Sequence, residues 1–259
     1  REDRTSTIHM VSAYAAANKL VLGQIKTDAK SNEITAIPEL LALLDIKGCL
    51  VSIDAMGCQT EIAETILQQG GDYLLAVKGN QPKLFEAVRQ ALAPLAATPL
   101  CAETMTLEKA HGRIDGREYH VMAAGELAAQ FPHWKQLHSI GVAISYRVEN
   151  MQKITIEQRY FISSKALVQD EFARAVRGHW AIENSLHWVL DVTMGEDDCP
   201  IYRGDAAEIL ACIRHMGLNM LRAETSRKAS VRRKQKIAGM SSEYLETVLN
   251  AGLKKLGEI

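Results

Sequence analysis

The sequence predicts a mixed α/β fold: a sheet flanked by helices, with an inserted antiparallel β region and a helical C-terminal part. Between residues 49 and 92, short apolar segments alternate with amphipathic ones, which is typical of parallel strands joined by helices. From 93 to 165, apolar and polar residues alternate, which indicates antiparallel strands. After residue 164 the apolar spacing returns to that of a helix.

Two strands and a hairpin turn open the chain. The segments "HMVSAYA" (9–15) and "LVLGQIK" (20–26) read as strands, and the "AANK" between them predicts a hairpin turn. A helix is expected over 33–44, with Asn32 as its N-cap. Pro38 lies inside this span, so it either belongs to the first turn or splits the helix.

A strand–helix–strand unit comes next. Residues 49–54 and 72–78 predict two buried strands, and a helix begins between them at Thr60 and ends at a Gly-Gly pair. Short links between these elements predict parallel strands joined by a right-handed crossover. A further helix is expected over about 82–92.

The second half of the chain combines β and helical segments. "REYHVMAA", "SIGVAISYRVE" and "KITIEQRYFIS" predict antiparallel strands, and helices are expected over about 170–192 and 205–224. The expected domains are a first core part (1–92), a β-rich insertion (93–165), a helical core part (166–225) and a basic C-terminal tail or helix (226–259).

Composition sets limits on the class of protein. An apolar fraction of 47% over 259 residues can build a sizeable core. No apolar run reaches the ~18 residues of a membrane span, and the start has no secretory signal, so no membrane partner is expected. Residue 1 is Arg and the first methionine is Met10, so we expect a fragment of a longer protein.

Charge and cysteines narrow the class further. The net charge of −1 gives no overall argument for nucleic acid, but seven Lys/Arg against one Glu lie between Arg222 and Lys236. Such a block either binds phosphates or forms a solvated helix face. Five scattered cysteines without a C-x-x-C pair indicate reduced thiols and a cytoplasmic location.

The first candidate catalytic residue is Asp54, which ends the apolar strand in "SIDAMGCQT". Ligands in α/β sheets bind beyond the carboxyl ends of parallel strands, and the small residues Ala55 and Gly57 leave room there. Alternatively, Asp54 caps the turn that follows the strand. Cys58 is a weaker candidate, as a nucleophile, because no histidine is placed beside it.

The second candidate is Glu183, in "RAVRGHWAIENSLHWVLDV". On a regular helix it shares a face with Phe172, Val176 and Leu186. A buried carboxylate needs a metal, a cation or a proton, so we expect either a metal ligand or a salt bridge to a nearby arginine such as Arg177.

Other polar side chains suggest weaker sites. His179, Glu183 and His187 are spaced i, i+4, i+8, which in principle suits a zinc ion. Lys78 follows the strand 72–78 and could reach a phosphate. Arg113 and Arg117, in "HGRIDGR", lie on an expected hairpin that either grips a nucleic-acid backbone or is an ordinary charged turn.

Five stretches together resemble one family. "KSNEITAIPELL", "IDAMGCQ", "DYLLAVKGNQ", "HGRI" with a following Arg, and "HWAIENSLHWVLDVTMGED" are similar to the bacterial H-repeat-associated proteins, which are DDE transposases of insertion sequences. The resemblance runs from about residue 7 to the basic tail. It implies a ribonuclease H-like core and DNA transposition by two-metal phosphoryl transfer, with Mg²⁺ (or Mn²⁺) held by acidic residues.

The resemblance also assigns residues and partners. It carries the second and third metal-binding acids onto Asp54 and Glu183, while Arg177 and His187 are expected to contact phosphates. Arg232 and Arg233 are expected DNA contacts of the basic tail. Insertion-sequence ends and target DNA are the expected partners, and a homodimer is one expected assembly.

The chain departs from the family pattern in two places. The family's first acid lies in an Asp-Gly-Lys on the first core strand, and none precedes His9. Related transposases have Tyr, Arg and Lys where this chain has Val176, His179 and Leu190. We therefore expect a chain that lacks its first strand and is catalytically impaired. Asp197, Asp198 and Arg203 have no assigned role.

Three functions are thus carried forward. The leading one is a transposase catalytic domain, and the alternatives are a ribonuclease H-like nuclease that only hydrolyses DNA and a non-catalytic DNA-binding remnant. A zinc hydrolase is a distant fourth. The transposase hypothesis predicts that the carboxylates of Asp54 and Glu183 come within about 4 to 8 Å of each other, so that they can share metal ions.

Overall fold

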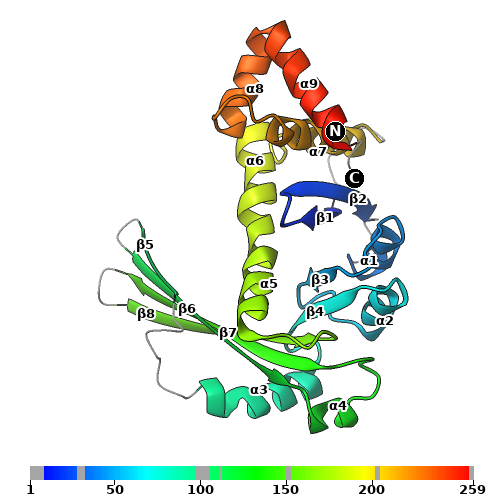
Figure 1. Ribbon diagram of the computed structural model, residues 1–259, viewed down its shortest axis with the longest axis vertical. Coiled ribbons are helices and arrows are strands. Elements are labelled where there is room, and N and C mark those ends of the chain that lie inside the picture. Colours follow the sequence, from blue (N-terminus) through cyan, green and yellow to red (C-terminus); the bar gives the residue numbers. More distant parts are fainter. Residues whose placement is uncertain are drawn as a thin grey trace. The chain divides into compact units, whose positions relative to one another are not determined.

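The computed structural model describes residues 9–27, 33–96, 106–110, 113–149, 153–201 and 205–256 (Figure 1). The chain divides into two compact units. The sheet unit comprises Ile37–His179, and the hairpin unit comprises the described residues of Arg1–Ala36 and Trp180–Ile259. Each unit has its own sheet and its own buried core, so the two are described separately.

The sheet unit is built on six strands in the order β3-β4-β8-β7-β6-β5. Strands β3 and β4 are parallel, and every other neighbouring pair is antiparallel. Its strands are β3 (Leu50–Ile53), β4 (Asp72–Val77), β5 (Thr106–Ala110), β6 (Arg113–Ala123), β7 (Ser139–Glu149) and β8 (Lys153–Ser163). Its helices are α1 (Glu33–Ala42) and α5 (Gln169–Ile182), which both cross the unit boundary, α2 (Thr60–Gln68), α3 (Pro82–Ala96) and α4 (Glu126–Gln130).

Helices cover both faces of this sheet, because successive side chains of a strand point to opposite sides. In β8, the ring of Phe161 packs edge-on against Phe172 of α5, at 5.6 Å between centroids. The neighbouring Tyr160 packs edge-on against Phe85 of α3, at 5.5 Å. Helices α5 and α3 therefore lie on opposite faces, as Figure 1 shows.

Glycine permits the close contact between α5 and the sheet. A Cβ on Gly141 of β7 would lie 2.6 Å from the Phe172 ring, and Phe172 is 1% exposed. Strand β4 lies between β3 and β8, and Tyr73, Leu74 and Leu75 are each at most 1% exposed. The continuous apolar run of "DYLLAV" thus fits a strand covered on both faces.

The hairpin unit pairs a small sheet with helices. Strands β1 (His9–Ala15) and β2 (Leu20–Thr27) form an antiparallel two-stranded sheet. The helical elements are the π-turn η1 (Glu183–His187), α6 (Trp188–Met194), α7 (Ala206–Ala223), α8 (Val231–Met240) and α9 (Ser242–Leu256). Val21 of β2 packs with Leu186, Leu190 and Leu218 in a buried cluster that joins β2, η1, α6 and α7.

The predicted mixed α/β class is confirmed, and so are the opening hairpin and the parallel pair β3–β4. Three details differ from the prediction. The hairpin forms a separate sheet, the inserted β region continues the β3–β4 sheet through β8, and the expected helix 170–192 contains a π-turn. Both alternatives for Pro38 are wrong, because it lies inside the continuous helix α1 and beyond its first turn. The expected cap Asn32 lies outside the described residues.

Candidate functional site

Asp54 lies directly after the carboxyl end of the parallel strand β3 and is exposed. Its Oδ1 accepts hydrogen bonds from the backbone N–H groups of Met56, at 3.1 Å, and Gly57, at 3.3 Å. The turn-capping role considered from the sequence is therefore present. Because both bonds reach Oδ1, Oδ2 is the oxygen that a metal ion would take.

The loop after β4 supports the Asp54 turn from the neighbouring strand. The Asn80 side chain donates to the backbone oxygen of Ala55 at 2.5 Å, and Gln81 donates to that of Cys58 at 3.0 Å. Lys78 is the first residue after β4 and is exposed. The parallel pairing thus brings the "IDAMGC" and "KGNQ" segments to one edge of the sheet.

Close packing also fixes the Asp54 turn. A Cβ on Gly57 would lie 2.4 Å from a methyl carbon of Ile53 and 3.0 Å from Ile37, so only glycine fits without a shift. Cys58 is fully buried. Burial and the charge of Asp54 raise the pKa of the Cys58 thiol to about 12, which argues against a nucleophilic cysteine because the thiolate is the reactive form.

Glu183 is the first residue of the π-turn η1, and its side chain is 59% exposed. The prediction that it lies within a buried apolar face is wrong. Phe172, Val176 and Leu186 are at most 2% exposed, but the π-turn inserts an extra residue and changes the phase of the helix. The expected burial cost therefore gives no support to a metal at Glu183.

The two histidines of the possible zinc site have separate partners. His187 Nδ1 lies 3.4 Å from Glu183 Oε2, whereas His179 Nδ1 lies 3.2 Å from the hydroxyl of Ser52 in β3. Across the described ranges, no three His, Cys, Asp or Glu side chains form a group that could hold a metal ion. The His179–Glu183–His187 zinc hypothesis gains no support from this geometry.

A group of acids follows the π-turn. Burial raises the pKa of Asp191, and the nearby charge of Asp197 adds to the effect. Burial likewise raises the pKa of Glu196, although Arg214 partly opposes it. Asp197 therefore acts on both neighbours through its charge, Asp198 is exposed, and Arg203 lies outside the described residues.

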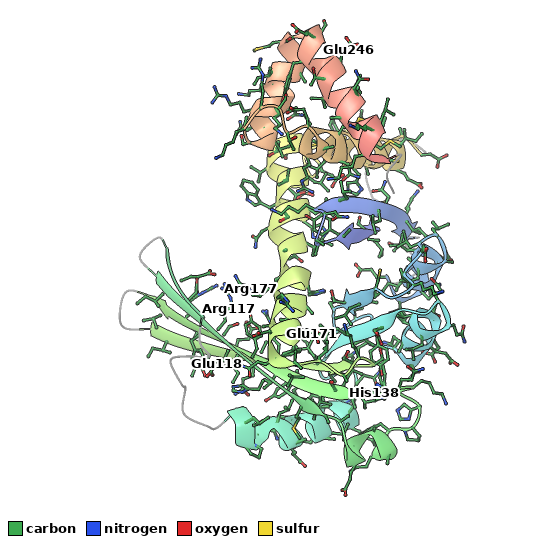
Figure 2. All side chains as sticks on the ribbon, viewed as in Figure 1. Arg117, Glu118, His138, Glu171, Arg177 and Glu246 are labelled. Atoms are coloured by element: carbon green, nitrogen blue, oxygen red, sulfur yellow. The ribbon has the colours of Figure 1, made fainter. Side chains whose placement is uncertain are left out.

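Two predicted DNA contacts in the sheet unit meet at one carboxylate. Arg117 of β6 lies 3.1 Å from Glu108 of β5, and Arg177 of α5 lies 3.5 Å from the same Glu108. Figure 2 shows Arg117 and Arg177 close to each other. Arg113 begins β6, and its side chain lies outside the described part of the chain.

The basic side chains from Arg222 to Lys236 differ in their exposure to solvent. Arg227, Lys228, Arg232, Arg233 and Lys236 are exposed. Lys234 is instead buried, and its Nζ contacts the Leu221 backbone oxygen at 3.1 Å, the Glu224 backbone oxygen, and Glu224 Oε2 at 3.3 Å.

Glu224 is the centre of this buried network. Tyr244 of α9 donates to its carboxylate at 2.5 Å, and the Arg227 backbone N–H donates at 3.1 Å. Burial alone would raise the pKa of Glu224, but hydrogen bonds from Ser226, Tyr244, Arg227 and Lys234 together lower it to about 2. The network joins α7, α8 and α9, a structural role that the charge pattern did not indicate.

Asp54 belongs to the sheet unit and Glu183 to the hairpin unit. Their approach to within metal-sharing distance stays a prediction. Neither the π-turn nor the contacts of Arg222 with the backbone oxygens of Lys19 and Ser185 was predicted from the sequence. The segment "ENSLH" is compatible with an ordinary helix. The π-turn and the Arg222 contacts are therefore visible only in the folded structure.

Comparison with known proteins places the chain in a class. The transposase DDE domain family matches residues 1–220, so the chain belongs to that family. Members of this family use divalent metal ions. None of the helices in the described part of the chain has the length and apolar character of a membrane span.

Relatives define the group more closely. The chain is 48% identical over 252 residues to the "Putative protein YbfL" and 47% identical over 252 residues to the "H repeat-associated putative transposase YhhI", both of Escherichia coli K12. Each match covers 95% of this chain and 66% of the relative, so the chain spans about two thirds of their length. The resemblance to the H-repeat-associated proteins is thereby confirmed.

A third relative and one solved structure complete the comparison. The "Putative transposase YncI" of Escherichia coli O157:H7 is 47% identical over 258 residues, covering 98% of this chain and 66% of that protein. A piggyBac transposase synaptic complex with hairpin DNA matches with a TM-score of 0.45 at 10% identity, covering 96% of this chain and 48% of the other. That similarity is too low to support an argument about fold.

Proposed function

We propose that the chain is the catalytic region of a DDE transposase with a ribonuclease H-like core, in which Asp54 and Glu183 hold divalent metal ions. The observation that carries the proposal is the Asp54 turn. An exposed carboxylate follows a parallel strand, anchored through one oxygen by two backbone N–H groups, in a chain that belongs to the transposase DDE domain family.

The donor groups fit Mg²⁺, which prefers oxygen ligands and keeps several of its waters. Asp54 and Glu183 are both exposed, so each can bind a hydrated ion without a large desolvation cost. When bound, the ions polarise the phosphodiester and activate water or a DNA 3′-hydroxyl. Asp54 and Glu183 supply negative charge and orientation, and Lys78 supplies a cation for a phosphate at the Asp54 edge.

Two acids alone hold a divalent ion more weakly than a complete site. The sequence contains no Asp-Gly-Lys, the motif expected to carry the first acid. We therefore expect the 259-residue chain by itself to bind Mg²⁺ or Mn²⁺ weakly and to have impaired activity. A longer chain with the first acid on a preceding strand would be expected to bind the metal more tightly.

DNA is the proposed partner, as insertion-sequence ends and target DNA. Exposed Arg232 and Arg233 on α8 provide positive charge for phosphates. Arg113 remains a proposed contact of the β6 strand. Arg117 and Arg177 would exchange the carboxylate of Glu108 for a phosphate, since both already bind one shared anion. His187 would contact DNA beside Glu183.

A strand-transfer assay tests the proposal. Labelled DNA that carries an insertion-sequence end is incubated with full-length protein, target DNA and Mn²⁺, and the products are separated by size. The transposase hypothesis predicts joined products that disappear in Asp54→Asn and Glu183→Gln variants. Cleavage without joining would favour the hydrolysis-only nuclease.

A gel-shift measurement of binding to the same DNA tests the non-catalytic alternative. A DNA-binding remnant predicts binding that needs no Mg²⁺, weakens steeply with salt and is unchanged by Asp54→Asn. Cleavage that survives both acid replacements would contradict the proposed function outright.

A further inference from the structure

Arg222 on α7 makes contacts that its place in the basic block does not explain. Its Nη1 donates to the backbone oxygen of Lys19 at 3.0 Å, and its Nη2 donates to the backbone oxygen of Ser185. Its Cζ lies 5.8 Å from the centroid of the Tyr14 ring. The guanidinium is thus partly buried and held within the hairpin unit, and burial lowers its pKa.

The Ser185 contact is important because Ser185 lies within the π-turn. The Trp188 backbone N–H donates to the oxygen of Glu183, five residues back, so the hydrogen-bond ladder changes register here. A donor from outside the helix stabilises such an irregular turn. The residue after Ser185, Leu186, is fully buried and packs in one cluster with Leu218. Two anchors therefore hold the turn that carries Glu183.

The Lys19 contact ties the same guanidinium to the β1–β2 turn. Lys19 has a positive φ of 55°, an uncommon conformation outside glycine. Asn219, three residues before Arg222, makes two hydrogen bonds to the backbone of Val21 in β2. The Val21 N–H donates to Asn219 Oδ1 at 3.0 Å, and Asn219 Nδ2 donates to the Val21 oxygen at 2.8 Å. One face of α7 thus holds the hairpin at two points.

We propose that Arg222 is a positioning residue for the metal site: it joins the β1–β2 turn to the π-turn and so fixes the direction of the Glu183 carboxylate. This inference rests on the proposed function of Glu183. A guanidinium is a rigid fork of five donors, whereas a lysine ammonium is a single point. Arg222 can therefore bind two carbonyl groups and the Tyr14 ring at once, which lysine cannot.

Hydrogen exchange tests the structural half of the proposal. Exchange of the Trp188 backbone amide is compared in the wild type and in the Arg222→Gln, Arg222→Lys and Asn219→Ala variants of the full chain. We expect at least about a tenfold faster exchange in Arg222→Gln, an intermediate rate in Arg222→Lys, and a near-wild-type rate in Asn219→Ala. Lys254→Gln, an exposed charge change on α9, is the surface control.

Binding of Mn²⁺, followed by electron paramagnetic resonance, tests the positioning half. Arg222→Gln is expected to weaken Mn²⁺ binding about tenfold, the size typical of lost support for a metal ligand. Asn219→Ala removes the two hydrogen bonds to Val21 but leaves both backbone contacts of Arg222 in place, so we expect little change in Mn²⁺ affinity. A general stability role would instead weaken Mn²⁺ binding in both variants, in proportion to their loss of unfolding free energy.

The outcomes separate this inference from the proposed function. Unchanged Trp188 exchange in Arg222→Gln overturns the inference, and so does loss of Mn²⁺ affinity that merely follows stability. If Glu183→Gln leaves Mn²⁺ binding unchanged, the proposed function fails, while Trp188 exchange still decides whether Arg222 holds the π-turn. Faster exchange together with weaker Mn²⁺ binding in Arg222→Gln supports both.

Discussion

The two candidate metal-binding acids are held in contrasting ways. Asp54 is fixed by its own turn, through N–H groups two and three residues later and a glycine at 57 that leaves no space for a side chain. Glu183 begins a π-turn that is held by Arg222, 37 residues from Ser185 in sequence. One acid is positioned by local backbone geometry and the other by a distant side chain.

This contrast shows how one pair of candidate metal ligands can depend on two kinds of structure. The Asp54 turn needs only β3, its neighbour β4 and the "KGNQ" loop. The Glu183 turn needs Arg222 of α7, which also binds the backbone oxygen of Lys19, and the core around Leu186. Changes far from Glu183 in sequence should therefore affect its function, whereas Asp54 should respond mainly to changes in its own loop.

The largest expected effect comes from removal of either acid. Asp54→Asn and Glu183→Gln preserve shape but remove a metal-binding charge, so each should lower Mn²⁺-dependent DNA cleavage by the full-length protein roughly 10³-fold. Gel-based cleavage rates measure this, with circular dichroism to confirm folding. A variant that keeps wild-type cleavage would remove that acid from the site.

The next largest effect concerns the buried ion pair between Lys234 of α8 and Glu224. Lys234→Met leaves the buried carboxylate of Glu224 without its cation, which should cost about 3–5 kcal/mol of unfolding free energy. Denaturant unfolding followed by circular dichroism measures it. Lys236→Gln, on an exposed position of the same helix, is the control and should change the free energy of unfolding by less than about 0.5 kcal/mol. Equal effects would show that the Lys234 contacts are not important.

A smaller effect is expected at the Asp54 turn. Gly57→Ala places a methyl group 2.4 Å from Ile53, so the turn must shift, at a cost of about 1–3 kcal/mol. Gly79→Ala is the matched control, because nothing lies within 4 Å of an added Cβ there. Thermal unfolding of both variants measures the difference. Comparable stability of the two would mean that close packing does not fix the Asp54 turn.

The last expected effect is a pH dependence that arises in the hairpin unit. The pKa of Glu224 is lowered to about 2 in the folded protein, below its ordinary value, so the unfolded chain binds the proton more readily. Its stabilising contribution is therefore complete above about pH 4.5 and is lost as pH falls toward 2. Unfolding free energy measured between these pH values should decline less in Glu224→Gln. An equal decline in both proteins would assign the effect to other groups.

Much of the sheet unit was predictable because its signals are local. The apolar run of "DYLLAV" indicated a buried strand, and Asp54 after "LVSI" indicated a carboxylate at the sheet edge. The Glu183 turn was not predictable. A helical period of 3.6 residues gave no sign of the π-turn, and Arg222 and Lys234 looked like surface charge. Their burial depends on partners such as Lys19, which is 203 residues away from Arg222.

Anomalous diffraction from manganese is the most direct test of a metal site shared by Asp54 and Glu183. Crystals of the full-length protein are soaked in Mn²⁺ and measured near the manganese absorption edge. We predict a peak about 2.1 Å from an oxygen of Asp54 and a peak at the same distance from Glu183, on one ion or on two neighbouring ions. Manganese that touches neither carboxylate, or two ions far apart, would contradict the shared site.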